Sequence, residues 1–532
     1  MAFSVPNASP ATGTNNLKKA ACPTSGLCPV CEEGCLGLCE VGKSAIRGSE
    51  LIYPAPFGAI TAGAQKDYPL DLSHFQIMGC VNKAQGIESD SDKAIFPNVN
   101  LEVVIGADKS DGIQCGLPVI IPGLGSTFVA TNNWKGLAAG AALAGVPLTI
   151  GENVCGMSSR TTYKGKKVQD APKLKERVDA YTDWQRDGYG AIVVQENVED
   201  SRAGVLEYAI RELGVQVVEL KWGQGAKDIG GEVKIRRLSK AKELKKRGYL
   251  VMPDPNDKAV EDAHDFGIFS EFERHSRIGF VQPDAFLKRA EALRSAGAKH
   301  VFLKTGAYRP ADLALAIRLA SDARLDLLTI DGAGGGTGMS PWPMMNEWGV
   351  PTVYLAALAY RYAKKLHDEG AYVPDIAFAG GMSLEDHMFK ILSLGAPFFK
   401  LAGMGRAPLT AAMVGKTIGF EIASHKVPAH LKKVESPEEV FVKAPWAVET
   451  FGKEYAKEYA GAVGVMTYFD RVAQGLKQLM CGARKFGLEH LTRSDLASLT
   501  KLASDVTGID YIMDMDAEAS NKILSGDFSL YE

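Results

Sequence analysis

The sequence predicts an α/β protein built on a (β/α)8 TIM barrel, with a cysteine-rich segment before the barrel and a helical extension after it. From residue 116 onward, short apolar runs alternate with helical stretches. Each apolar run is followed at once by glycine or polar residues. Because parallel barrel strands all end at one rim, we expect these residues to meet at a single mouth, where barrel enzymes bind substrates.

Length and charge narrow the possibilities further. A chain of 532 residues can form one barrel with additions, and its net charge of -3 offers no basic surface for nucleic acid. No apolar run reaches the roughly 20 residues of a membrane helix, and the N-terminus lacks the order of a signal peptide. We therefore expect a soluble, cytoplasmic protein without a nucleic-acid or membrane partner.

Residues 1–50 form the first expected region. Residues 1 to about 20 are rich in Ser, Thr, Asn, Pro and Ala, and they carry no pattern that predicts structure. Five cysteines then follow within eighteen residues, namely Cys22, Cys28, Cys31, Cys35 and Cys39. Four of them can ligate a 4Fe-4S iron–sulfur cluster. Zinc bound by four cysteines is the main alternative, and free thiols or a disulfide cluster is another.

The second expected region, residues 51–115, carries no motif with a chemical meaning. Its mixture of apolar and polar segments predicts an antiparallel or loop-rich lead into the barrel. Cys80 and Cys115 are isolated in the sequence. Both are interpreted as buried small hydrophobic residues.

The barrel is expected within residues 116–430. Its strands are predicted in LPVIIPGL, LTIGENVCG, AIVVQENV, VQVVELKWGQGAK, HVFLKTGAY, LDLLTIDGAGG, DIAFAGGMS and APFFKLAGMG. Helices are expected near 131–145, 284–297, 310–322 and 383–394.

Two further segments lie outside this alternation. Residues 233–282 contain a basic helical run and then an acidic, Pro-containing stretch, which predicts an insertion or lid over the mouth. A solvated charged face is the simpler explanation of these charges. Residues 431–532 predict a helical extension that packs on the barrel or on a partner subunit.

The segment LLTIDGAGGGTGMSP, residues 327–341, is the strongest candidate for a binding loop. A buried strand ends at Asp331, and glycines crowd the residues that follow. Such a loop brings backbone N–H groups close to a phosphate or a flat cofactor ring. The candidate cofactor contacts here are Asp331, Gly335, Gly336, Thr337 and Gly338. A flexible surface loop is the alternative.

The order of this loop resembles the FMN-binding segment of the glutamate synthase synthase domain, where Gly-Gly-Thr-Gly-Ala-Ser-Pro occupies the same place. A second segment, KWGQGAKDIGGEV, is similar to the Lys-x-x-Gln-Gly-Ala-Lys-Pro-Gly-x-Gly-Gly segment of that family. Both segments occur in the family's order. The resemblance covers about residues 116–430 and implies FMN as the cofactor.

The resemblance also implies roles for individual side chains. Lys221 and Gln224 would approach the flavin, and Lys227 would serve the substrate. Lys304 would lie against the flavin pyrimidine, where a cation stabilises the anionic reduced ring. Glu152 would face the substrate and relay protons. The expected catalytic residues are thus Lys227, Glu152 and Gln224, and lysines that are merely structural are the alternative.

Glycine turns after other strands complete the expected FMN site. Turns of this kind after late strands commonly hold a flavin phosphate in such barrels. The candidates are Gly380, Gly381, Gly403, Met404, Gly405 and Arg406, together with Gly125, Ser126 and Thr127 after the first strand. Arg406 can add a charged contact to the phosphate, although a surface ion pair is an equal alternative.

Several departures from the family pattern bear on the substrate. The glutaminase domain is absent, and no cysteines follow the last glycine turn where the family binds a three-iron cluster. A family glutamine corresponds to Glu232, and a family arginine corresponds to Ser239. Losing an arginine and gaining a carboxylate would weaken recognition of a dicarboxylate such as 2-oxoglutarate.

The predicted function is therefore an FMN- and iron–sulfur-dependent oxidoreductase of glutamate synthase type. It would reduce an imine of a 2-oxo acid, such as that formed from 2-oxoglutarate and ammonia on the way to glutamate, with electrons from a ferredoxin-like donor. A separate amidotransferase subunit and a homo-oligomer are expected partners. The alternatives are an N-methylglutamate synthase-like condensation with an amine, a flavin enzyme that reduces a C=C bond, and an electron-transfer subunit without a substrate.

Overall fold

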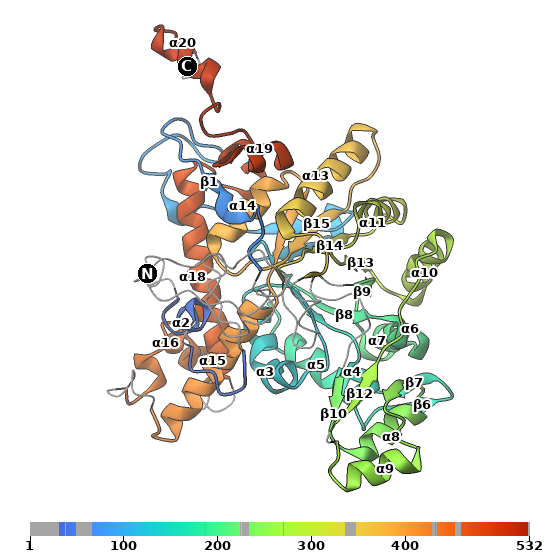
Figure 1. Ribbon diagram of the computed structural model, residues 1–532. Helices are drawn as coiled ribbons and strands as arrows, with labels where there is room; N and C mark the ends of the chain where they lie inside the picture. Colours follow the sequence, from blue (N-terminus) through green and yellow to red (C-terminus); the bar gives the residue numbers. More distant parts are fainter. Residues whose placement is uncertain are drawn as a thin grey trace.

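The computed structural model, shown in Figure 1, describes most of the chain. The described residues are 31–37, 39–48, 66–186, 188–223, 225, 233–269, 271–335, 347–427, 431, 434–452 and 459–529.

A closed barrel of eight parallel strands forms the centre of the molecule, which confirms the predicted fold class. Its strands are β4 (Val119–Leu124), β5 (Leu148–Ile150), β8 (Ile192–Glu196), β9 (Val217–Lys221), β13 (His300–Thr305), β14 (Leu327–Asp331), β15 (Asp375–Ala379) and β16 (Phe399–Gly403). The barrel closes where β16 pairs with β4, with Gly403 opposite Ile120. Every strand lies within a segment that the sequence predicted.

Helices surround the strands (Figure 1). They are α3 (Phe128–Leu143), α4 (Val154–Met157), α5 (Pro172–Thr182), α6 (Val198–Ala203), α7 (Val205–Leu213), α10 (Pro283–Ala296), α11 (Pro310–Asp322), α13 (Thr352–Asp368), α14 (Glu385–Leu394) and α15 (Arg406–Ala423). Three of them, α5, α10 and α11, begin with proline. Proline fits the first turn because its fixed φ is helical and the missing N–H has no partner there.

An apolar layer fills the part of the barrel near the amino ends of the strands, and a hairpin covers that end. The hairpin pairs β2 (Val103–Ile105) with β3 (Ile113–Cys115), and its Ile105 and Cys115 are buried with inward residues such as Phe302. The predicted antiparallel lead into the barrel is thus observed. Burial raises the pKa of the Cys115 thiol, as expected for a buried hydrophobic residue. The same prediction is wrong for Cys80, which is exposed in a loop where its thiol contacts the carbonyl of Asn82.

The insertion after β9 is a small subdomain with its own sheet. Antiparallel strands β10 (Val233–Ile235), β12 (Phe272–His275) and β11 (Leu250–Met252) carry α8 (Leu238–Lys246) and α9 (Lys258–Asp265). The basic run forms α8 as predicted, whereas the short strands were not predicted. Arg247 donates to the carbonyl of Gly156 at 2.8 Å, which attaches the insertion to α4. Nearby, β6 (Thr162–Lys164) and β7 (Lys167–Asp170) form a separate hairpin.

The C-terminal part packs along one side of the barrel (Figure 1). It contains α16 (Ala444–Phe451), α18 (Ala460–Gly482), β17 (Leu496–Ser498) and α19 (Lys501–Thr507). Helix α20 (Ala517–Leu524) follows them and projects away from the barrel (Figure 1). Helix α18 lies against α15, α3 and α14, and α2 (Glu40–Arg47) packs on both α15 and α18. Strand β17 pairs with β1 (Phe75–Ile77), a contact that the sequence did not predict. No helix in the described ranges is both long and apolar enough to span a bilayer.

Candidate active site at the mouth of the barrel

Two lysines from neighbouring strands lie at the carboxyl ends of the barrel. Lys304 on β13 pairs in register with Lys221 on β9. Lys304 is only 3% exposed, and its Nζ lies 3.4 Å from Oδ2 of Asp331 at the end of β14. Nζ of Lys221 lies 2.8 Å from Oε1 of Glu152, in the loop after β5. Each ammonium therefore has a carboxylate of its own, which offsets the repulsion between adjacent cations.

A third carboxylate lies below these pairs, inside the barrel. Glu219 precedes Lys221 by two residues on β9, so both side chains lie on the same face of the strand. The amide of Gln195 on β8 donates to Oε1 of Glu219, and Oγ1 of Thr329 on β14 donates to Oε2 at 3.4 Å. Sequence reasoning missed Glu219. The available signal was its alternation with Val217 and Lys221, which places it on the inner face.

Glycines leave the rim free of side chains next to these charges. A Cβ on Gly125 would lie 2.7 Å from the carbonyl oxygen of Glu152. Gly380 has φ +134°, and a Cβ there would lie 2.3 Å from Oγ1 of Thr352. A Cβ on Gly335 would approach Cα of Gly380 to 3.3 Å. The loops after β4, β14 and β15 thus pack backbone against backbone, which is how a protein brings N–H groups close to a ligand.

Arg406 stands at the start of α15, after the last barrel strand. This long helix begins without a side-chain cap, so its first N–H groups favour an anion. Burial lowers the pKa of Arg406, while the nearby charges of Cys31 and Asp331 act to raise it. No hydrogen bond or ion pair of Arg406 is found within the described ranges. At the first position of α15, next to the end of β16, Arg406 is a candidate donor for an anion.

The donor set fits FMN. Lys304 and Lys221 supply cations at the floor of the mouth, where a ring that gains negative charge is stabilised. The glycine turns leave room for a flat ring. Arg406 and the N-terminus of α15 supply donors for a phosphate at the edge of the same mouth.

Other predicted contacts have structural partners. Oγ1 of Thr127 accepts from the N–H of Ala130 and caps α3, and Ser126 precedes it in the same partly buried loop. Sδ of Met404 accepts from Tyr468 on α18, so the Met404 side chain lies in the helical layer. The guanidinium of Arg177 donates to the carbonyls of Leu124 and Gly125 and holds the first glycine loop in place.

The remaining glycines also lie at the rim. Gly381 has φ +110°, and a Cβ there would lie 3.4 Å from the carbonyl oxygen of Gly334. A Cβ on Gly403 would meet Cβ of Ala379 at 2.6 Å, so β16 and β15 pack closely. Gly405 lies beside Pro122 of β4.

Some predicted site residues lie outside the described ranges and stay predictions. They are Gln224, Lys227, Gly336, Thr337 and Gly338, together with Cys22 and Cys28. Glu232 lies outside these ranges too.

The described cysteines lie next to α15. Sγ of Cys31 lies 3.4 Å from Oγ1 of Thr410. The sulfurs of Cys35 and Cys39 accept from the N–H groups of Gly37 and Gly42. Among the residues that the structure describes, no group of three His, Cys, Asp or Glu is arranged to hold a metal. The iron–sulfur cluster therefore stays a prediction.

A buried polar network beside Glu152 was not predicted from the sequence. Asn153 has φ +68°, its N–H donates to Oδ2 of Asp200 at 2.7 Å, and its Oδ1 accepts from Arg274 of the insertion at 3.0 Å. Burial raises the pKa of Asp200 to about 7, although the Asn153 N–H opposes the shift. The insertion is thus attached to the loop that presents Glu152.

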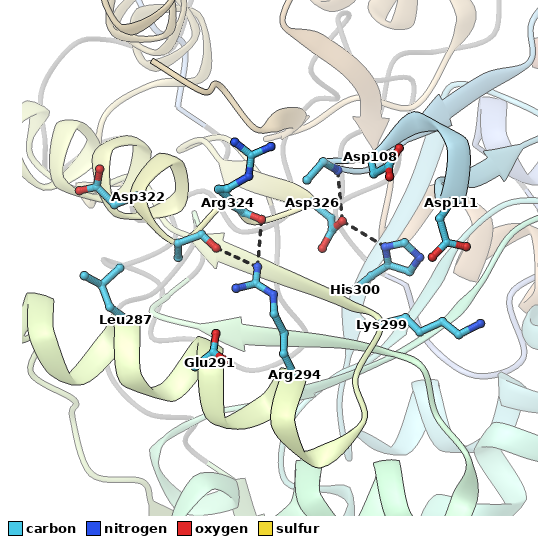
Figure 2. A pocket seen from close by; sticks show the side chains of 12 residues that line it. Asp108, Asp111, Leu287, Glu291, Arg294, Lys299, His300, Asp322, Arg324 and Asp326 are labelled. Carbon is cyan, nitrogen blue, oxygen red and sulfur yellow. Dashed lines mark hydrogen bonds and ion pairs between the residues drawn. The ribbon is translucent and has the colours of Figure 1, made fainter. Parts of the chain in front are cut away.

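A cavity of about 590 Å³ lies at the opposite end of the barrel (Figure 2). It is bordered by the starts of β13 and β14 and by the loop between β2 and β3. Nδ1 of His300 lies 3.1 Å from Oδ1 of Asp326, and this oxygen also accepts from the N–H of Ala107. The other oxygen, Oδ2, accepts from the N–H of Val301. None of the residues predicted for the site lines this cavity.

Comparisons with known proteins agree with the predicted family. Residues 274–414 match a family model described as the conserved region in glutamate synthase. This match confirms the resemblance to the glutamate synthase family, and with it the prediction of an FMN-dependent oxidoreductase. No curated protein sequence matches the chain.

Solved structures with a similar fold are distant. A mutant flavocytochrome b2 with pyruvate bound is 13% identical, with 81% of this chain and 78% of that chain covered at a TM-score of 0.43. A putative lactate oxidase from Pediococcus acidilactici is 15% identical, with coverages of 81% and 84% and a TM-score of 0.43. An (S)-mandelate dehydrogenase is 12% identical, with coverages of 80% and 89% and a TM-score of 0.41. These likenesses are too distant to support an argument about the site.

Proposed function

Since the chain carries the conserved region of glutamate synthase, we propose that it is an FMN- and iron–sulfur-dependent oxidoreductase of glutamate synthase type. Its substrate is the imine that a 2-oxo acid forms with ammonia or an amine, with 2-oxoglutarate and ammonia as the first choice. Its electrons come from a ferredoxin-like donor in the cytoplasm. A homo-oligomer and a separate amidotransferase subunit that supplies ammonia are part of the proposal.

The convergence of Lys221 and Lys304 carries this proposal. Two neighbouring strands each place an ammonium at the same rim. Lys221 pairs with Glu152 in the loop after β5, and Lys304 pairs with Asp331 at the end of β14. Burying charged groups costs free energy, so such pairs are weak evidence for a stabilising role alone, and a role in binding is the explanation that we propose. Cations of this kind favour a flavin that gains negative charge, and FMN, when bound, supplies the electrons that reduce the C=N bond.

Glu152 and Lys221 are the groups best placed to handle the substrate's protons. Oε1 of Glu152 and Nζ of Lys221 are already within hydrogen-bond distance of each other, at 2.8 Å. One of them can therefore release or take a proton while the other holds the compensating charge. Lys227, outside the described ranges, is assigned to the substrate through the family resemblance.

Four of the five cysteines Cys22, Cys28, Cys31, Cys35 and Cys39 are the proposed ligands of a 4Fe-4S cluster. Two observations support this placement beside the mouth. Sγ of Cys31 lies 3.4 Å from Oγ1 of Thr410, which is in the first turns of α15, the helix that begins at Arg406. N–H groups that donate to the sulfurs of Cys35 and Cys39 are the kind of hydrogen bond that stabilises cluster thiolates.

A second candidate substrate follows from the departures from the family pattern. Ser239 stands where the family has an arginine, and it is exposed on α8 of the insertion. Since a dicarboxylate would lose that arginine contact, the second candidate is a small monocarboxylic 2-oxo acid, or condensation with an amine in place of ammonia. A C=C reductase or an electron-transfer subunit would use the same FMN contacts.

Turnover with defined substrates tests the proposal. The holoprotein, supplied with reduced ferredoxin and ammonium, is assayed with 2-oxoglutarate, pyruvate and glyoxylate, and then with methylamine in place of ammonium. Formation of an amino acid or N-methyl amino acid supports the proposal and identifies the substrate. Reduced donor that is oxidised only by an unsaturated acid, or by no small molecule, contradicts it.

A further inference from the structure

Glu219 is a buried carboxylate that the residues assigned to FMN and substrate leave unexplained. It is 1% exposed, on the inner face of β9 and just above the apolar layer that contains Val217 and Phe302. An ionisable group at such a position costs several kcal/mol unless neighbours compensate for the lost water. Its presence therefore calls for a reason beyond packing.

The groups around Glu219 form a connected set directly beneath the mouth. Gln195 donates to one carboxylate oxygen and Thr329 to the other. Gly123 leaves space for the Gln195 amide, because a Cβ there would lie 2.6 Å from Oε1 of Gln195. Oε1 of Gln195 has no hydrogen-bond partner within the described ranges. Side chains from β8, which is next to β9, and from β14, which is two strands away on the other side, thus hold Glu219 in one position.

The charges that act on Glu219 are those of the mouth. Burial raises the pKa of Glu219, while the ammonium groups of Lys304 and Lys221 and the hydrogen bonds from Gln195 and Thr329 act to lower it. The other charged groups at this level are Glu152 and Asp331, which pair with the two lysines. Three carboxylates therefore share two ammonium groups.

We infer that Glu219 is a positioning residue that fixes the positive charge which Lys304 and Lys221 present to the FMN ring, and so sets the reduction potential of the flavin. This inference rests on the proposed function, because it requires FMN in the mouth. A negative charge under the lysines cancels part of their attraction for the reduced ring. It therefore keeps the potential low, as reduction of a C=N bond requires.

Glu219→Gln is the variant that tests this role. Glutamine keeps the size of the side chain and an oxygen that can accept from Thr329, but it removes the charge. We expect reduced FMN to bind at least about tenfold more favourably relative to oxidised FMN, which raises the midpoint potential by about 30 mV for a two-electron couple. The difference from the native protein should widen as the pH rises, because only the native protein can ionise at this position.

Glu196→Gln is a matched control from the neighbouring strand β8. Glu196 is also buried, but it faces the helices, where Arg289 donates to both of its carboxylate oxygens at 3.0 and 2.9 Å. Its loss should lower the free energy of unfolding and leave the potential unchanged. Thr329→Val is the milder second variant. It removes the hydrogen bond that stabilises the ionised form of Glu219, so it should raise the midpoint potential by less than Glu219→Gln does.

A redox titration of the holoproteins, followed by flavin absorbance, separates the outcomes. A higher potential in Glu219→Gln and a smaller rise in Thr329→Val, with no change in Glu196→Gln, support the inference. Unchanged potentials in the first two variants, or the same shift in Glu196→Gln, overturn it while FMN binding and the proposed function stand. A native protein that binds no FMN overturns the proposed function itself.

Discussion

Two buried aspartates at opposite ends of the barrel have pKa values that are shifted in opposite directions. Asp200, beside the mouth, is 2% exposed, and burial raises its pKa to about 7. Asp326, at the other end, is 6% exposed, yet its pKa is lowered, because hydrogen bonds from His300, Val301 and Ala107 outweigh the effect of burial. Burial alone therefore does not decide the charge of a carboxylate. The hydrogen-bond donors and the charges around it decide as well, and Glu152 and Glu196 both act to raise the pKa of Asp200.

The mouth of the barrel and the cavity at its other end also differ in how their carboxylates are compensated. Around Asp326, donors satisfy the carboxylate, and Arg294 donates to the carbonyls of Ala323 and Arg324 (Figure 2). At the mouth, three carboxylates share two lysines, and glycines leave the rim uncovered. None of the residues predicted for the site lines the cavity of about 590 Å³. The two buried lysines and the uncovered backbone N–H groups indicate the mouth as the binding site.

The largest expected effect comes from removing a cation at the mouth. Lys304→Met takes away the charge beside Asp331 and should lower turnover by about 100-fold or more, as loss of a preorganised charge at a reacting centre does. FMN should also bind more weakly, which fluorescence titration of the apoprotein measures. Lys299→Met removes a lysine at the other end of the barrel and should change neither quantity. Equal losses in both variants would refute the contrast between the two ends.

The pH dependence of stability is the next largest effect. The pKa of Asp200 is near 7 in the folded protein and near 4 in the unfolded chain. Between these values only the folded state holds the proton, so the stability that this group adds is lost as the pH rises from about 4 through about 7, up to about 4 kcal/mol. Asp200→Asn should flatten this part of the profile in urea unfolding. An unaltered slope would contradict the raised pKa.

Asp326→Ala should act in the opposite sense at the other end of the barrel. Its lowered pKa means that the ionised form stabilises the fold at neutral pH, and that this contribution is lost as the pH falls below about 4. The variant leaves three donors without an acceptor, so we expect a loss of about 3 kcal/mol in the free energy of unfolding at pH 7. FMN affinity should not change. A large fall in affinity would show that this end also serves the cofactor.

The smallest expected effect comes from replacing a glycine by alanine, which distinguishes backbone strain from loss of a ligand contact at the rim. Gly381 and Gly165 both have positive φ, but a Cβ on Gly381 would meet the carbonyl oxygen of Gly334 at 3.4 Å, whereas nothing lies within 4 Å of one on Gly165. Both alanine variants should lose about 1 kcal/mol of unfolding free energy. Only Gly381→Ala should also weaken FMN binding. If Gly165→Ala weakens it as much, the effect reflects backbone strain alone.

Much of the fold could be predicted from the sequence, because each barrel strand is an apolar run that ends in glycine or polar residues. That pattern also placed Lys221, Lys304, Asp331 and Glu152 at one rim, where the structure brings them together in two pairs. Glu219 was missed even though VVELK alternates. Lys221 and Asp331 end their strands and Lys304 lies one residue from the end of its strand, whereas Glu219 lies two residues before the end of β9.

Other features depend on contacts between distant segments, which no local pattern reveals. Asn153, Asp200 and Arg274 come from three separate segments and meet only after the insertion folds onto α4. The insertion's strands have three or four residues each, too few to show an alternation. Cys80 was misplaced because an isolated cysteine carries no positional signal in the sequence.

The claim that the mouth holds FMN is tested most directly by the cofactor content of the protein purified without oxygen. Heat release followed by chromatography and fluorescence measures flavin per chain. One FMN per chain in the native protein, and far less in Lys304→Met, is the predicted result. A native protein without flavin that also fails to take up added FMN would contradict the claim.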